Sequence, residues 1–93
     1  AEIAVGDKVN IELNKYPTHS YGVLPGRIAS VSFVPYNKSY AVEVDFPDGL
    51  VTTNRKEIKY EIDMSGRAEI ITSSRSILSR IFAPVYELFS TTE

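Results

Sequence analysis

Short segments in which apolar and polar residues alternate constrain the fold of this chain more than any other feature. The alternation is clearest over residues 9–13 and 40–46, where every second side chain is apolar. Gly6-Asp7 precedes the first segment and Pro47-Asp48-Gly49 follows the second, so both are bounded by residues that favour turns. A period of two is typical of a strand with one buried face. The two segments are therefore predicted to be half-buried β-strands.

Three further segments are predicted to be extended. Residues 27–34 are rich in β-branched and small side chains on both sides, which fits a strand covered on both faces, and residues 58–62 and 67–72 alternate more briefly. Glycine and proline interrupt residues 14–26, and residues 35–39 have the composition of a turn, so loops are expected there. Four to six short strands at this spacing favour a mostly β fold, a small antiparallel β-barrel or sandwich, over a βαβ fold.

The apolar period changes in the last part of the chain. After a candidate N-cap at Ser73 or Ser74, apolar residues recur at helical spacing, which predicts an amphipathic helix with one apolar face. Pro84 deletes a helical hydrogen bond at a cost of about 3 kcal/mol, so we expect a stop or kink near Ala83. The chain is thus divided into a β domain over residues 1–73 and a helix with a tail over residues 74–93. The predicted apolar face consists of Ile77, Leu78, Ile81, Phe82, Val85, Leu88 and Phe89.

Composition limits the chemistry available to the chain. The net charge is -2 with dispersed charges, and the densest basic cluster, Arg55, Lys56 and Lys59, is diluted by Glu57 and Glu61. A nucleic-acid partner is not expected, because phosphate binding requires a basic patch. The chain has no cysteine and one histidine. Disulfides and thiolate ligands are thereby excluded, and we expect neither a metal nor another cofactor.

Candidate catalytic residues have simpler interpretations. His19 lies in a polar loop without a nucleophile elbow around any serine, so it is interpreted as a surface histidine. Glu43 and Asp45 share one side of a strand and can in principle act as acid and base. They lie opposite the apolar side, however, which favours a solvated outer face. Tyrosines that can form a stacking platform are interpreted mainly as core and loop packing residues: Tyr16, Tyr21, Tyr36 and Tyr40.

Several short motifs occur in an order that points to a known family. The pieces are G-x-x-V-x-I from Gly6, P-x-x-x-Y-G-x-x-x-G-x-I from Pro17, M-x-G-x-A-x-I from Met64, and Arg75-Ser76 before the predicted apolar helix containing Pro84. Each piece is weak alone, but together they cover nearly the whole chain. In this order the chain resembles the C-terminal part of the HlyD-like periplasmic adaptor, or membrane fusion, proteins.

The resemblance implies a membrane-proximal β-barrel domain with a mechanical role in secretion or efflux and no catalysis. Its implied partners are an inner-membrane transporter, often of the ABC type, other adaptor subunits in a ring, and an outer-membrane channel reached through a hairpin outside this chain. The implied location is the periplasm, with a membrane anchor outside the chain. The chain begins with Ala1, and we expect it to be a piece of a larger protein.

Structural and contact roles can be assigned to individual residues on this basis. Turn or close-approach positions are expected at Gly6, Gly22, Gly26 and Gly66. Partner contacts are expected at Tyr16, Pro17, Tyr21 and the Ile77–Phe89 face. For the tyrosines, local loop packing is the competing interpretation. Leu50 to Ile62 is more charged than a short linker before the methionine turn would be, which leaves the strand pairing there open.

Two other functions remain open at this level. An independent small β-barrel that binds a small molecule, an oligosaccharide or a single-stranded nucleic acid predicts a chain complete in itself. The adaptor hypothesis instead predicts upstream heptad repeats, two half-motifs of a lipoyl-like fold and one transmembrane helix. A hydrolase that uses His19 predicts turnover that the substitution His19→Ala abolishes, and no such turnover is expected.

Overall fold

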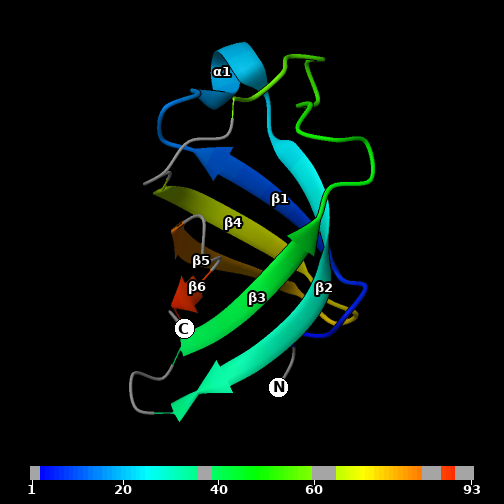
Figure 1. Ribbon diagram of the computed structural model, residues 1–93, viewed down its shortest axis with the longest axis vertical. Coiled ribbons are helices and arrows are strands. Elements are labelled where there is room, and N and C mark those ends of the chain that lie inside the picture. The colour runs from blue at the N-terminus through cyan, green and yellow to red at the C-terminus, as the bar shows by residue number, and fades with distance from the viewer. Residues whose placement is uncertain (1–2, 36–38, 60–64, 83–86, 90–93) are drawn as a thin grey trace.

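The computed structural model describes residues 3–35, 39–59, 65–82 and 87–89. Within these ranges the chain is mostly β, with one helix of a single turn (Figure 1). The elements in chain order are β1 (Lys8–Leu13), α1 (Thr18–Tyr21), β2 (Leu24–Val34), β3 (Ser39–Asp45), β4 (Ser65–Ile71), β5 (Ser76–Phe82) and β6 (Glu87–Phe89). The predicted mostly β, antiparallel fold is confirmed.

The five longer strands form one antiparallel sheet in the order β3-β2-β1-β4-β5. By themselves these five strands do not close on each other. The three-residue strand β6 lies between the two outer strands and pairs with Ser39–Ala41 of β3 and with Arg80–Phe82 of β5. The strand pairings therefore run round in the order β1-β2-β3-β6-β5-β4 and return to β1, and β6 alone joins β3 to β5.

One core lies on the concave side of this sheet, as the alternation predicted. On β1 the side chains of Val9 and Ile11 are buried, and on β4 those of Ala68 and Ile70. On β3, Val42 is buried and Val44 packs against the same core. The full set of buried apolar side chains is Ile3, Val9, Ile11, Leu24, Ile28, Val42, Ile58, Ala68, Ile70 and Ile81.

A β-bulge resets the alternation in β2. Ile28 pairs with Val44 of β3, but the next registered pair is Ser30 with Glu43, so one extra residue is accommodated in β2. Ile28 is buried and Val31, three residues later, packs against the core. A bulge moves the following residues by one position, which explains why residues 27–34 looked apolar on both sides in the sequence.

β2 begins earlier than predicted. Pro25 and Gly26, assigned from the sequence to a loop, lie in the strand and pair with Asn10 and Val9 of β1. The register with β3 starts only at Arg27, so this first part of β2 has a strand neighbour on one side. A proline lacks an N–H donor and is tolerated where one side of the strand has no ladder to complete.

The helix predicted over residues 74–93 is wrong, because Ser76–Phe82 forms β5 and Glu87–Phe89 forms β6. Ile77 and Ile81 are four residues apart, a spacing that places two side chains on one side of a helix and also on one face of a strand. The residues between them decide the assignment, because Leu78 is 61% exposed whereas Ser79 is 4% exposed. β5 pairs with β4 along its whole length, which satisfies backbone groups that a helix would leave unpaired on β4.

The serines assigned to a helix cap form a hairpin turn instead. The Thr72 hydroxyl accepts hydrogen bonds from the backbone N–H groups of Ser74 (3.3 Å) and Arg75 (3.0 Å), and it donates to the Arg75 carbonyl at 2.8 Å. The Thr72 N–H also donates to the Arg75 carbonyl, at 2.9 Å. Thr72 thereby closes the connection from β4 to β5. Ala83, Pro84 and Val85 lie outside the described residues, as does the predicted kink.

Other sequence predictions are met or corrected in detail. The predicted strand 40–46 corresponds to β3, and its Pro47-Asp48-Gly49 turn is confirmed by a hydrogen bond from the Gly49 N–H to the Phe46 carbonyl at 2.9 Å. Ser65 and Gly66, predicted to lie in a turn, belong to β4. Met64 lies outside the described residues, as do residues 36–38 of the predicted turn over 35–39.

Candidate functional site

One end of the sheet is covered by α1 together with residues 50–59, which we call the cap (Figure 1). Residues 50–58 fold back on themselves, with the Ile58 N–H donating to the Leu50 carbonyl at 2.8 Å and the Thr52 N–H donating to the Lys56 carbonyl at 2.8 Å. The buried Thr52 hydroxyl accepts from the Lys56 N–H at 3.2 Å. The charged stretch whose pairing was left open is therefore a short hairpin-like loop.

Side-chain and backbone hydrogen bonds join the two parts of the cap. The Thr53 hydroxyl accepts a hydrogen bond from the Val23 N–H at 3.1 Å, and the Thr53 N–H donates to the Val23 carbonyl at 2.8 Å. The Asn54 side-chain amide donates to the Ser20 carbonyl at 3.1 Å. These bonds fix the loop against α1 and against the start of β2.

Of the tyrosines predicted to contact partners, Tyr21 lies in this cap and Tyr16 lies just before it. The rings of Tyr16 and Tyr21 meet edge to face at a centroid distance of 4.9 Å, and both side chains pack against the core. Tyr16 donates its hydroxyl to the Lys59 carbonyl at 3.5 Å, and the Lys56 ammonium lies 5.9 Å from the Tyr21 ring centroid. Local packing therefore accounts for most of the surface of both tyrosines, whereas Pro17 is exposed at the start of α1.

The four glycines singled out in the sequence fall into two classes. Gly6 and Gly22 lie in turns and have positive φ angles of 94° and 80°. Gly26 and Gly66 lie inside strands, where an added Cβ atom would contact the adjacent strand. At Gly26 it would lie 2.6 Å from the Val44 side chain, and at Gly66 it would overlap the Glu12 carbonyl. These two glycines allow adjacent strands to approach closely.

The apolar contact face predicted for the C-terminal segment does not form one surface, because β5 directs alternate side chains to opposite sides of the sheet. Ile77 and Ile81 point towards the core, whereas Leu78 points outwards and is 61% exposed. Phe82 belongs to β5, and Leu88 and Phe89 belong to β6. Val85 lies outside the described residues. Of the predicted face, Leu78 alone among the described side chains is turned to the exterior.

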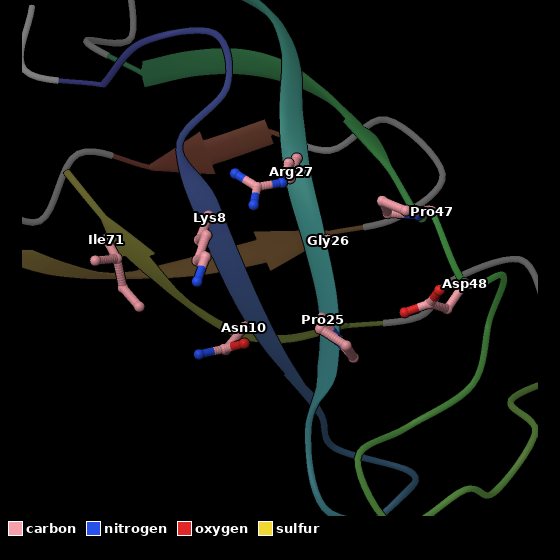
Figure 2. A pocket seen from close by; sticks show the side chains of 8 residues that line it. All are labelled: Lys8, Asn10, Pro25, Gly26, Arg27, Pro47, Asp48 and Ile71. Carbon is pink, nitrogen blue, oxygen red and sulfur yellow. The ribbon is translucent and has the colours of Figure 1, made fainter.

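A hollow of about 440 Å³ lies on the outer side of the sheet (Figure 2). Its walls are the first residues of β1 and β2, the end of β4 and the turn after β3. Figure 2 shows the Arg27 guanidinium extending from β2 towards Lys8 on β1. The lining residues are Lys8, Asn10, Pro25, Gly26, Arg27, Pro47, Asp48 and Ile71.

Lys8 and Arg27 are direct cross-strand neighbours in this hollow, and both are exposed. Like charges at such positions repel each other. A second pair of opposed cations, Arg67 and Arg80, lies across β4 and β5. There the Arg67 guanidinium has a carboxylate partner, Glu12, at 3.5 Å. Among the residues that the structure describes, neither Lys8 nor Arg27 has a carboxylate at ion-pair distance, and Arg27 donates to the Gly6 carbonyl at 3.0 Å.

The residues considered for catalysis lie on different elements, α1 and β3. His19 lies exposed in α1, which replaces part of the predicted loop. Glu43 and Asp45 are exposed on the outer side of β3, and Glu43 accepts a hydrogen bond from the Ser30 hydroxyl at 3.0 Å. Within the described ranges no group of three or more histidine or acidic side chains is arranged to hold a metal ion.

Comparison of the chain with protein-family models, with curated protein sequences and with solved structures gives no significant match. No helix in the described part of the chain has the length and apolar character needed to cross a membrane.

The hollow was not predicted from the sequence, although one signal for it was present. Lys8 lies on the polar side of β1, and Arg27 follows Gly26 at the start of a predicted strand. Their juxtaposition depends on the β1–β2 register, which in turn depends on the extension of β2 through Pro25. The loop predicted over residues 14–26 concealed this register.

Proposed function

We propose that the chain is the membrane-proximal β domain of a HlyD-like periplasmic adaptor, which links an inner-membrane exporter to an outer-membrane channel. The domain acts by contacts between proteins and carries no catalysis. In this proposal the domain lies in the periplasm, its membrane anchor precedes it in the full protein, and several copies assemble into a ring. A small closed barrel, joined through β6, is part of the same proposal.

The observation that carries this proposal is the ordered set of short motifs. The G-x-x-V-x-I segment from Gly6 corresponds to the turn before β1 and to the buried residues Val9 and Ile11. The segment from Pro17 contains α1 and the first part of β2, and the segment from Met64 contains Ala68 and Ile70 of β4. The described apolar positions of these three motifs, Val9, Ile11, Ile28, Ala68 and Ile70, are thus core residues, which supports a shared fold as the reason for the shared pattern.

Outward-facing features support a contact role. Leu78 and Ile71 are 61% and 38% exposed on the outer side of β5 and β4. Leu78 pairs with Glu69 and Ser76 pairs with Ile71, so the two apolar side chains are diagonal neighbours on one face. An exposed apolar pair of this kind is suited to a protein interface. The contact role that the sequence analysis gave to a terminal helix is therefore assigned here to the outer surface of β4 and β5.

The first test is the reading frame upstream of Ala1. The proposal predicts a transmembrane helix, two lipoyl-like half-motifs and, between them, heptad repeats with apolar a and d positions. A frame that encodes none of these would contradict it.

The second test uses cysteine cross-linking in the full-length protein within cells. The chain has no cysteine of its own, so Leu78→Cys introduces one reactive site into this domain. We expect membrane-impermeant, thiol-reactive cross-linkers to join Leu78→Cys to a neighbouring adaptor or to the transporter. Ser79→Cys, buried at the adjacent position, is the matched control and should remain unlinked. Equal labelling at both positions, or no linked product from Leu78→Cys, would argue against this interface.

A further inference from the structure

We propose that the hollow lined by Lys8 and Arg27 binds an extended acidic peptide segment of a partner protein. The site shares Ile71 with the apolar Leu78 surface but is otherwise formed by different residues, and the inference does not depend on the adaptor assignment. It rests on three features of the hollow: two opposed cations, an apolar neighbour in the same row of the sheet, and an acidic rim.

The two cations define the charge of the occupant. Lys8 and Arg27 face each other across β1 and β2. Asp45 of β3 is the other cross-strand neighbour of Arg27, but no described carboxylate lies at ion-pair distance from either cation, whereas the equivalent pair Arg67 and Arg80 is relieved by Glu12. A carboxylate placed between Lys8 and Arg27 would remove their repulsion. The Arg27 contact with the Gly6 carbonyl uses one nitrogen of a guanidinium that carries five N–H donors, so others remain to bind an anion.

Three cross-strand partners in the hollow define how far apart the apolar and acidic side chains of the bound peptide must be. Ile71 of β4, Lys8 of β1 and Arg27 of β2 are successive cross-strand partners. Adjacent strands are about 4.8 Å apart, so a point midway between the two cations lies about 7 Å from Ile71. Two residues of an extended peptide span about 7 Å, and side chains two residues apart point to the same side. The fitting segment therefore has an apolar residue and a Glu or Asp two positions apart.

The remaining walls favour a peptide over a phosphate group. Asn10 shares the outer side of β1 with Lys8 and offers an amide that can both donate to and accept from a peptide backbone. Pro25 and Pro47 add apolar surface. Asp48 on the rim repels a second negative charge, which penalises a phosphate dianion more than a single carboxylate. The volume of about 440 Å³ lies in the range of small ligand sites.

The test is an NMR titration of the isotopically labelled chain with the tetrapeptide acetyl-Leu-Ser-Glu-Ser-amide. We expect chemical-shift changes at the backbone amides of Lys8, Asn10, Arg27 and Ile71. Replacing Glu by Gln in the peptide, or moving it next to Leu, should raise the Kd about fivefold. Lys8→Gln and Arg27→Gln should each raise the Kd for the original peptide about threefold to fivefold.

The matched control variant is Arg67→Gln, which removes one cation from the other opposed pair and should leave the Kd unchanged. Each variant's spectrum also reports whether the fold is retained. Four results would overturn the proposal: equal binding of the Glu and Gln peptides, equal weakening by Arg67→Gln, inorganic phosphate binding at the same amides more tightly than the peptide, or no shifts up to about 10 mM peptide.

Discussion

The sheet of strands β1–β5, which we call the wall, and the cap are held together by different interactions. In the wall, Gly66 leaves room for the Glu12 carbonyl, and the buried small side chains of Ala68 and Ser79 are partners across β4 and β5. In the cap, the Thr52 and Thr53 hydroxyls accept hydrogen bonds from the backbone N–H groups of Lys56 and Val23, and the Asn54 amide donates to the Ser20 carbonyl of α1. The wall therefore depends on shape and burial, and the cap depends on a few directional bonds. Substitutions should separate these two regions by the size of their effect.

The largest loss of stability is expected for Ile70→Ala in the wall. Ile70 is 0% exposed and lies between β1 and β5, so truncation leaves a cavity in the core. The free energy of unfolding should fall by about 2–5 kcal/mol. Urea denaturation followed by circular dichroism measures this change. Ile71→Ala, at the next position but on the outer side, is the control and should cost less than about 1 kcal/mol.

A second pair of substitutions tests which way β5 faces. Ser79→Leu inserts a large side chain into the packed interior and should cost about 1–3 kcal/mol. Leu78→Ser, on the exposed side, should change the free energy of unfolding by less than about 1 kcal/mol. An amphipathic helix predicts the reverse order, so a costly Leu78→Ser with a harmless Ser79→Leu would contradict the strand.

At the edge of the cap, directly after α1, Gly22→Ala should cost about 2 kcal/mol. The alanine must adopt a φ of 80°, and its Cβ would also displace Thr53, which bonds to Val23. Gly6→Ala is a matched control, since Gly6 has a φ of 94° but nothing within 4 Å of the added Cβ. It should cost about 1 kcal/mol. The difference between the two losses in thermal unfolding reports the Thr53 contact together with the backbone strain of Gly22, whose ψ is -155°. Equal losses would contradict a contribution from the Thr53 contact.

The smallest expected effect is a gain in stability on substitution of Arg55, in the loop of the cap. Arg55 has a φ of 62°, the left-handed conformation that glycine adopts without strain. Arg55→Gly should therefore raise the free energy of unfolding by up to about 1 kcal/mol, provided that the arginine side chain contributes no packing. Arg55→Ala keeps the strain and should give no gain. A loss of stability in Arg55→Gly would show that the side chain itself holds the loop.

The wall was predictable from sequence wherever a strand has one buried face and no bulge. β1, β3 and β4 follow their alternation closely, and the buried positions Val9, Val42 and Ile70 were all expected. β2 was harder, because the bulge after Ile28 changes which side chains point inwards. The early start of β2 at Leu24 was missed because proline and glycine are rare in strands.

β5 was misassigned for a different reason. Its spacing of Ile77 and Ile81 fits a helix and a strand alike, and its interior side chain at the middle position is a serine, not an apolar residue. The partner strand β4 provides the hydrogen bonds that stabilise the extended form, and this pairing cannot be inferred from the sequence of residues 76–82 alone. The Lys8–Arg27 hollow was missed similarly, since it exists only through pairing of β1 with β2.

The central claim is that residues 76–82 complete the antiparallel wall and are not a docking helix. The most direct measurement is a set of nuclear Overhauser effects and Cα chemical shifts for this segment in the labelled chain. The structure predicts cross-strand contacts between the main chains of Ala68 and Ser79 and of Ile70 and Ile77, with extended-chain Cα shifts. Helical Cα shifts over residues 76–82, with strong contacts between successive amide protons and none to β4, would contradict it.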